Sequence, residues 1–450
     1  MEDSQGVRLY RRGAALTLVR EFLLRDEIDG VPQSRPSPVV VFAGAGKSAL
    51  LAELAWRLDQ NAPCALIDCE DFAGGSRELL AVLAFKLSRR RGRYRELTFP
   101  RLITGLIAIN DVNLSDLNLK ADREQAQERV RKALEDRQNT AGPLQQTLSD
   151  IIEAGAGALG AGAAALGGSP PAVPQPLVDL LRRVVPGLVL HWLAATRSGR
   201  KLILGVGQDW YGHQDRGLGH SPLDVLVDLN GMARGPEREE DRREAASLLW
   251  AAFLADLDVA FAGRGSVNWT FNCLALLDNA DARVARGFLE ELVAARQKRG
   301  RRWDPLTMVV TSRGSLAEQR APRGGKITPL ADASAAPRAR RDTSASRRWF
   351  PVALPDLAVT DVAAMVDRLE LPAGTRRIGL TSAVYRYTDG HPVAVGALLD
   401  AIADWQETDL AAILDGSAPA ITEQKRPPAG TPTGCRRIPR QAAGAERGCR

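Results

Sequence analysis

Hydrophobic and polar positions alternate with changing periods along the chain, and each period predicts an element. Short continuous apolar runs are typical of strands buried on both faces of a parallel sheet, and they occur at 39–42, 65–68, 273–277, 307–311 and 350–354. Apolar residues at helical spacing predict helices at 14–25, 48–58, 77–90 and 284–298. Because strands and helices alternate, we expect an α/β fold with a parallel sheet flanked by helices.

The central part of the chain, residues 96–270, interrupts this alternation. It reads as a mostly helical and irregular insertion, whose clearest amphipathic helix covers 244–261. A Gly/Ala-rich and Pro-rich stretch at 154–176 predicts a linker. Gly and Ala contribute little transfer free energy, so this stretch is not expected to cross a membrane.

The last third of the chain predicts a smaller helical part and a tail. The segment 315–347 is rich in Arg, Ala and Ser and predicts a disordered loop. Helices are expected at 361–369 and within 382–404, and they would form a small lid over residues 356–417. Residues 418–450 hold Pro, Gly and Arg with few apolar side chains, which predicts a disordered basic tail.

Charge and cysteine content bear on whether the protein binds nucleic acid and on the compartment in which it works. The net charge is +6, but residues 421–450 contain seven Lys or Arg and two Glu, so the remainder is almost neutral. Net charge therefore does not indicate a folded basic face for nucleic acid. The five cysteines form no CxxC pair, and neither a leader with an apolar core nor a run of eighteen apolar residues is present. We expect a cytoplasmic protein with reduced thiols and no membrane segment.

Residues 42–48 predict a phosphate-binding loop between a strand and a helix. Glycines allow backbone N–H groups to wrap an anion, a lysine reaches the β- and γ-phosphates, and a hydroxyl at the helix start coordinates Mg²⁺. The expected nucleotide-binding residues are Gly44, Ala45, Gly46, Lys47, Ser48 and Ala49. The pattern G-x-x-x-x-G-K-[ST] requires a further glycine where the chain has Val41. Either Val41 replaces that glycine, or the loop is shorter by two or three residues.

Asp278 is the candidate metal-side carboxylate. It follows the apolar run 274–277, and P-loop proteins hold Mg²⁺ through an acidic residue at the end of such a strand. The alternative is that Asp278 caps the segment that follows it. The next residue is Asn279, which cannot act as a base, and Asp281 lies on a turn of unknown direction. We therefore expect slow hydrolysis, or hydrolysis that needs outside help.

Two other clusters are weaker candidates. His213 and His220 lie in a stretch without helical period, so a loop is favoured over a metal site. The basic run 86–95 could contact nucleic acid, but it also ends an amphipathic helix, where basic side chains complement the helix dipole and face solvent.

Four further segments resemble motifs of the NB-ARC-like STAND class of signal-transduction NTPases, a branch of the AAA+ group. Residues 9–12 are similar to the entry motif, with Arg12 at its arginine and Arg11 where glycine is usual. Residues 309–313 are similar to the sensor strand, and residues 354–357 are similar to the L-x-x-L segment. Residues 390–395 are similar to the GLPL motif. The four segments follow the family order beside the loop and Asp278, and the similarity covers residues 9–91 and 271–400.

The resemblance implies a switch that holds ADP when off and ATP when on. Lys47 and Asp278 would serve turnover, Ser48 and Asp278 would hold Mg²⁺, Arg313 would sense the γ-phosphate, and Pro392 would lie near the base. The implied organisation is an NTPase domain in two parts, 1–95 and 271–355, around the 96–270 insertion, followed by the 356–417 lid. The partners implied are the nucleotide and a protein partner or a second copy of the chain.

Two other functions stay open at this point. One is a nucleic-acid-associated AAA+ ATPase that uses the run 86–95 and the tail. The other is a degenerate scaffold that binds no nucleotide, as Val41 and Asn279 suggest. Nothing after about residue 417 resembles the winged-helix domain or the repeats usual in the family, and the tail could mark a truncated or frameshifted product.

Overall fold

The computed structural model describes most of the chain outside the centre and the two termini. The described residues are 12–28, 31–33, 37–59, 61–70, 72–89, 94–119, 121–139, 207–212, 221–234, 239–262, 266, 268–299, 304–321, 327–335, 348–369 and 377–403. Contacts divide the chain into two compact units. The first comprises Met1–Leu357 with His391–Val393, and the second comprises Ala358–Gly390 with Ala394–Arg450. The predicted linker at 154–176 and the tail at 418–450 lie outside the described residues.

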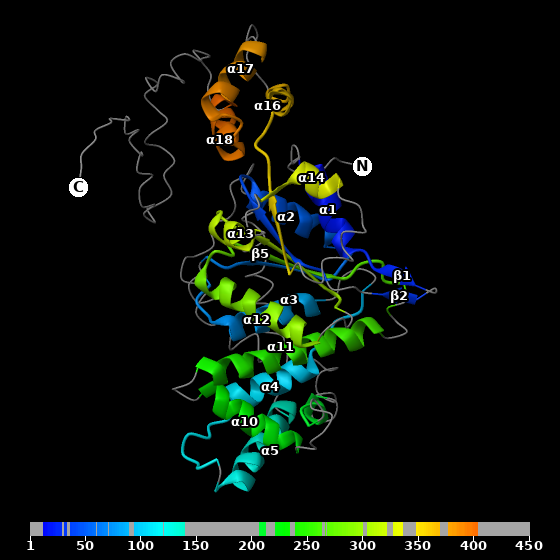
Figure 1. Ribbon diagram of the computed structural model, residues 1–450, viewed down its shortest axis with the longest axis vertical. Helices are drawn as coiled ribbons and strands as arrows, with labels where there is room; N and C mark the ends of the chain where they lie inside the picture. Colours follow the sequence, from blue (N-terminus) through cyan, green and yellow to red (C-terminus); the bar gives the residue numbers. More distant parts are fainter. Residues whose placement is uncertain are drawn as a thin grey trace, which may run out of the picture. The chain divides into compact units, whose positions relative to one another are not determined.

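A six-stranded parallel sheet forms the centre of the first unit (Figure 1). Its order is β4-β5-β6-β3-β8-β7, and every neighbouring pair runs parallel. The strands are β3 (Val39–Ala43), β4 (Cys64–Asp68), β5 (Cys273–Asp278), β6 (Leu306–Thr311), β7 (Thr328–Pro329) and β8 (Trp349–Ala353). This confirms the expectation of an α/β fold with a parallel sheet flanked by helices.

Alternate residues of β3 point to the two faces of the sheet, as the strand period requires. Val40 and Phe42 share a buried cluster with residues of α1 (Gly13–Leu23), α2 (Lys47–Leu58) and α14 (Leu330–Ala335). Val39 and Val41 share another with residues of α3 (Ser76–Ser88), α12 (Arg283–Arg299) and α13 (Ser315–Arg320). The sheet is therefore the middle of three layers.

A helical layer packs beyond α3 and α12 (Figure 1). It consists of α4 (Pro100–Asn110), α5 (Arg123–Asn139), α9 (Gln208–Trp210), α10 (Pro222–Arg234) and α11 (Glu239–Ala262). Its apolar side chains join the same buried cluster as Val39 and Val41. The described residues between 96 and 270 are thus largely helical, and they are packed on the sheet domain through α3 and α12.

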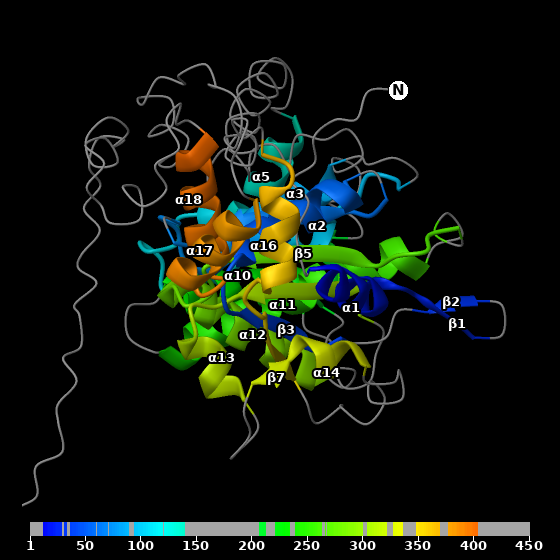
Figure 2. The same cartoon turned by 90° about the horizontal axis from the view of Figure 1, so that it is seen from above.

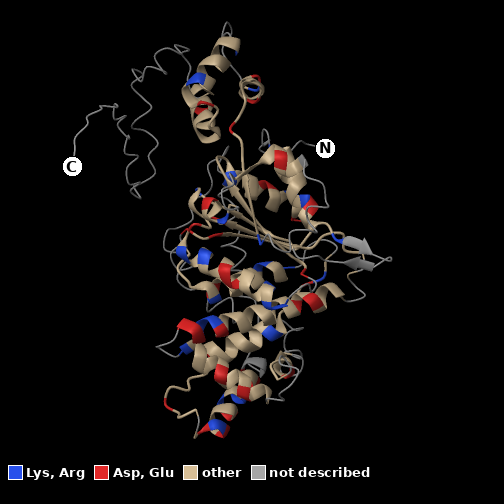
Figure 3. Cartoon of the chain, viewed as in Figure 1, with Lys and Arg blue, Asp and Glu red and all other residues tan. Residues whose placement is uncertain are grey.

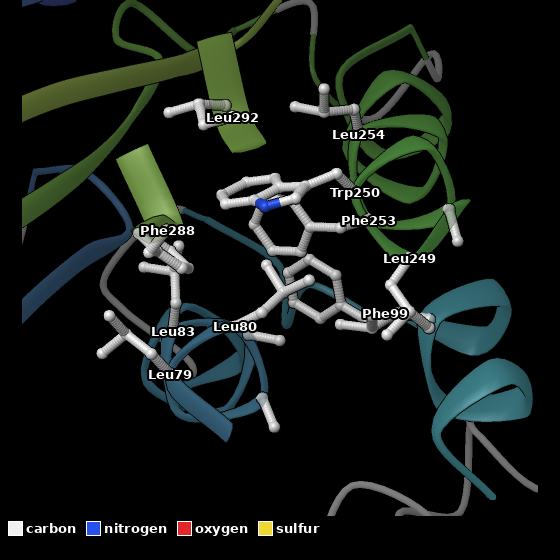
Figure 4. Close-up of a cluster of buried hydrophobic side chains, with 14 of the residues drawn as sticks. Leu79, Leu80, Leu83, Phe99, Leu249, Trp250, Phe253, Leu254, Phe288 and Leu292 are labelled. Carbon is white, nitrogen blue, oxygen red and sulfur yellow. The ribbon is translucent and has the colours of Figure 1, made fainter. Parts of the chain in front are cut away.

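Aromatic rings fill the space between this layer and the sheet domain (Figure 4). Phe253 stacks on Phe99 with ring centroids 5.1 Å apart and planes 2° apart. Trp250 meets Phe253 edge-on at 5.6 Å and Phe288 of α12 at 4.8 Å. Offset and edge-on ring pairs add about 0.5–1.5 kcal/mol each beyond the burial of their area. The Trp250–Phe288 pair therefore holds α11 on α12, and the Phe253–Phe99 pair holds α11 on the segment before α4.

Helix α11 is long and apolar enough, by length and composition, to cross a membrane, alone among the helices of the described residues. Half of its apolar window is buried inside the protein. Contacts with α3, α4, α10 and α12 account for this burial, so packing in the core explains the hydropathy of α11.

Two segments of the first unit differ from the sequence expectations. The prediction of a disordered loop over 315–347 is wrong for its described residues, because α13, β7 and α14 lie there and bury Leu316, Ala317 and Leu330. The antiparallel strands β1 (Asp26–Ile28) and β2 (Val31–Gln33) were not predicted, and they project from the sheet domain in both views (Figures 1 and 2).

The second unit contains α16 (Val359–Val366), α17 (Arg377–Thr388) and most of α18 (Pro392–Ala403). The predicted helical stretch 382–404 is broken between α17 and α18 by Asp389 and Gly390, whose φ angles are 49° and 71°. Both residues occupy the left-handed region, which ends a helix and which glycine tolerates best.

Candidate functional site

The carboxyl ends of the parallel strands bring the predicted site residues to one edge of the sheet, which we call the carboxyl edge. Strand β3 leads there into the glycine loop, defined as residues 44–46, while β5 ends at Asp278 and β6 ends at Thr311. Strand β6 pairs with both β3 and β5. Ligands of open α/β sheets bind at this edge, where the strand order changes direction.

The glycine loop contains three residues between the end of β3 and the start of α2. Gly44 and Gly46 have φ angles of 111° and 73°, which favour glycine. A side chain at Gly44 would also place its Cβ 2.5 Å from the carbonyl oxygen of Leu354. Both glycines are therefore required by the backbone.

Val41 lies inside β3 rather than in the loop. It pairs with Val310 on one side and Pro351 on the other, and it is fully buried. Of the two explanations for the missing glycine, the structure supports the shorter loop. A three-residue loop offers an anion fewer backbone N–H groups than a loop of the full pattern.

Lys47 is the first residue of α2, and its ammonium group donates a hydrogen bond to the Gly44 carbonyl. Burial lowers the pKa of Lys47, while the negative charges of Asp278 and Asp281 act to raise it. The helix start has Gly46 at the N-cap, without a side-chain hydrogen bond, and Ser48 and Ala49 are exposed in the first turn. The free N–H groups of such a turn favour an anion.

Asp278 accepts hydrogen bonds from the Thr311 hydroxyl and from the N–H of Asn279, the latter at 3.1 Å. The same N–H lies 3.0 Å from the Thr311 hydroxyl oxygen. Asn279 adopts a φ of 57°, and its side-chain amide donates to Asp68 at 2.9 Å. Asn279 thus links carboxylates on two neighbouring strands, whose residues Asp68 and Asp278 are register partners.

Asp68 was not singled out from the sequence. Its signal was present, because Asp68 ends an apolar strand just as Asp278 does. The sequence does not show that β4 and β5 are neighbours in the sheet, so it could not show that Asp68 and Asp278 lie side by side.

Asp281 points toward the start of α13. It accepts hydrogen bonds from the hydroxyls of Ser312 and Ser315 and from the N–H groups of Arg313 and Leu316, and it pairs with Arg286. Burial acts to raise the pKa of Asp281, but these hydrogen bonds outweigh it and lower the pKa. A carboxylate held by so many donors is a poor proton acceptor, and its evident task is to anchor the turn after β6.

Arg313 follows β6, and its guanidinium pairs with Glu70, which follows β4. The Arg313 side chain exposes 63% of its area and the Glu70 side chain exposes 47%. Arg313 also acts on the electrostatics of Lys47 and lowers its pKa. Pro392 is the first residue of α18, and the segment His391–Val393 groups with the first unit.

The described residues contain no group of three or more His, Cys, Asp or Glu side chains placed to hold a metal ion. Magnesium in nucleotide sites needs fewer protein ligands, because it keeps several waters and binds substrate phosphates. Ser48 at the start of α2 and Asp278 at the end of β5 supply the hydroxyl and carboxylate oxygens that Mg²⁺ prefers. The donor set therefore fits a nucleoside polyphosphate with Mg²⁺.

Within the basic run 86–95, Lys86 differs from the interpretation as a solvated face, whereas Arg95 is exposed. Lys86 is largely buried and donates to the Leu66 carbonyl at 2.6 Å, and burial lowers its pKa to about 8. Residues 90–93, like His213 and His220, lie outside the described residues. Among the described cysteines, Cys64, Cys69 and Cys273 are buried free thiols.

No protein-family model matches the chain, and no curated protein matches its sequence.

Proposed function

We propose that this chain binds ATP and ADP with Mg²⁺ at the carboxyl edge and acts as a nucleotide-dependent switch with slow hydrolysis. The observation that carries the proposal is the arrangement of Lys47 and Ser48 at the start of α2, behind two glycines with positive φ. The negative charges of Asp278 and Asp281 act to raise the pKa of Lys47, which supports the assignment of the lysine and the carboxylates to one site.

The strand order supports the assignment of a sensing role to Arg313. Because β6 lies between β3 and β5, the residues after β6 emerge between the glycine loop and Asp278. An arginine there can offer a forked, charge-assisted contact to a terminal phosphate. Its ion pair with Glu70 would then be exchanged for the phosphate, and the Lys47–Gly44 hydrogen bond would be exchanged in the same way.

Slow hydrolysis follows from the groups around Asp278. Asn279 cannot take a proton, and its amide is used to hold Asp68. Asp281 is occupied by the turn after β6. The proposal has further parts. It includes the role of a switch, a protein partner or second copy that would respond to it, and a cytoplasmic location. It also includes the finer fold, which is a P-loop NTPase domain with a helical insertion at 96–270 and a lid at 356–417, and a place for Pro392 near the base.

The short glycine loop favours a second candidate, a scaffold that has lost nucleotide binding. Three residues give a phosphate fewer N–H donors than the full loop gives. A nucleic-acid role gains no support from the described residues, where acidic and basic side chains are interleaved along the helices (Figure 3).

Calorimetric titration of the purified protein with ADP and ATP in Mg²⁺ decides between the two candidates. Micromolar binding that disappears in Lys47→Ala is expected from the switch. Lys298→Ala is the matched control, since Lys298 contacts Ser247 in the helical layer and should leave binding unchanged. Absence of binding in the unmodified protein would establish the scaffold and overturn the switch.

A further inference from the structure

A buried arginine joins the glycine loop to two other parts of the first unit. Arg12 stands at the N-cap of α1, and only 2% of its area is exposed. Its Nη2 donates to the carbonyl of Ala45 at 2.8 Å, and its Nη1 donates to the carbonyl of Pro355 at 2.8 Å. One guanidinium thus holds the start of α1, the glycine loop and the segment that follows β8.

The Ala45 hydrogen bond fixes the orientation of a peptide plane within the loop. A trans peptide is planar, and its C=O and N–H groups point in opposite directions. When the Ala45 carbonyl points at Arg12, the N–H of Gly46 points away from the buried guanidinium. In a phosphate-binding loop the direction of the N–H groups determines whether they can converge on an anion.

The loop has little else in its own sequence to fix this direction. Gly44 and Gly46 lack side chains and permit many backbone conformations, and Ala45 carries no polar group. The neighbouring contacts reinforce the same attachment, because Leu354 N–H donates to the Ala43 carbonyl at 2.7 Å and the Leu354 carbonyl leaves no space for a side chain at Gly44. The guanidinium also lies directly beside Gly46, where an added Cβ would be 3.3 Å from its Nη2.

We propose that Arg12 is a positioning residue that holds the shortened glycine loop in its anion-binding conformation through its hydrogen bonds to Ala45 and Pro355. The part of this inference that concerns nucleotide rests on the proposed function, whereas the part that concerns the loop does not. Arg12 acts through the backbone of the loop, and its two donor nitrogens are needed together. Lysine carries its three N–H donors on one nitrogen in place of the planar fork, so it does not reproduce the geometry of two bonds donated from separate nitrogens.

Arg25 provides a matched control within the same unit. Its guanidinium also donates to backbone carbonyls, those of Ser266 at 2.8 Å and Phe261 at 3.1 Å, and burial lowers its pKa. These carbonyls belong to the end of α11 and the segment before β5. Arg25→Gln therefore removes a clamp of the same chemistry without touching the glycine loop.

Hydrogen–deuterium exchange of the full chain without nucleotide tests the clamp itself. In Arg12→Gln we expect the amide of Leu50, which donates to the Gly46 carbonyl, and the amide of Leu354, which donates to the Ala43 carbonyl, to exchange about tenfold faster than in the unmodified protein, the scale of one lost charge-assisted hydrogen bond. Arg12→Lys should show a similar change, and it is the variant to use if Arg12→Gln does not fold. Unchanged exchange at Leu50 and Leu354 in a folded Arg12 variant, or an equal increase there in Arg25→Gln, would overturn the inference.

Titration with ADP and Mg²⁺ then tests the consequence for binding. We expect about tenfold weaker binding in both Arg12 variants and unchanged binding in Arg25→Gln. If the unmodified protein binds no nucleotide while the exchange result holds, the clamp stands and the proposed function fails. If the unmodified protein binds nucleotide and both Arg12 variants bind it equally well, Arg12 is not a positioning residue.

Discussion

The carboxyl edge and the helical layer differ in what holds their residues in place. At the edge, polar groups are fixed by hydrogen bonds between strand ends, such as those of Asp278 with Thr311 and Asn279. In the layer, side chains are fixed by the packing of large rings such as Trp250 and Phe253. The edge can therefore exchange hydrogen bonds for a ligand without opening a cavity, while a ring of the layer cannot move without leaving one.

Two lysines show the same contrast. Burial lowers the pKa of both Lys47 and Lys86. At the edge, Asp278 and Asp281 oppose the shift for Lys47, so its charge is supported by carboxylates. Beside the layer, Arg89 lowers the pKa of Lys86 further, and the net pKa is about 8. A cation is thus supported at the candidate site and disfavoured in the interior.

The largest expected effect comes from removing a ring in the layer. Phe253→Ala should lower the free energy of unfolding by about 3–5 kcal/mol, because it removes a stack with Phe99 and leaves a cavity. Denaturant unfolding measures this. Trp56→Ala, at a tryptophan 62% exposed on α2, should change the same quantity by less than about 0.5 kcal/mol. Nucleotide affinity lost in folded Phe253→Ala would show that edge and layer are coupled after all.

A methyl group in the glycine loop should have a smaller effect on stability and a larger one on binding. Gly44→Ala places a side chain at a φ of 111° and against the Leu354 carbonyl, so we expect a loss of about 1–2 kcal/mol in unfolding free energy. We also expect loss of ADP binding in calorimetric titration, since the loop must move.

Gly287→Ala is the matched change in the helix α12, where nothing lies within 4 Å of the added Cβ. It should raise the unfolding free energy by about 0.5–1 kcal/mol, because alanine loses less backbone entropy in a helix. ADP binding that survives Gly44→Ala would contradict the assignment of the loop.

The smallest expected effect concerns the pH dependence of stability. Between pH 8 and the unfolded pKa of 10.5, unfolded Lys86 binds a proton that folded Lys86 does not, so stability rises with pH in this window. Below pH 8 both states are protonated and the contribution is constant. Relative to Lys86→Met, the unmodified protein should gain about 1 kcal/mol of unfolding free energy between about pH 7 and pH 8.7. Parallel curves for the two proteins in urea titrations would show that Lys86 is not buried.

The strands and the helices next to them could be predicted because their signals are local. The runs at 39–42, 273–277 and 307–311 are continuous and apolar, and the structure places β3, β5 and β6 there. The glycines and Lys47 were likewise readable, since their roles depend on backbone conformation and on neighbours in sequence. Local patterns were wrong over 315–347, where Leu316 and Leu330 are buried by tertiary contacts that composition does not reveal.

The rest of the candidate site depends on pairs of residues far apart in sequence. Asp68 gains significance because β4 pairs with β5, and Glu70 because it faces Arg313. The contact of Arg12 with Pro355 spans 343 positions. No periodicity or motif fixes such distances, so only the folded chain could reveal these partners.

The contact between Lys86 and Leu66 has a consequence for assembly. Among the described strands β4 is outermost in the sheet, and a strand in this position presents backbone groups that could recruit a strand from another molecule. Lys86 already donates a hydrogen bond to the Leu66 carbonyl, which opposes such recruitment. At the opposite edge of the sheet, β7 is two residues long. Copies of this chain should therefore associate through side-chain surfaces and resist growth into a continuous intermolecular sheet.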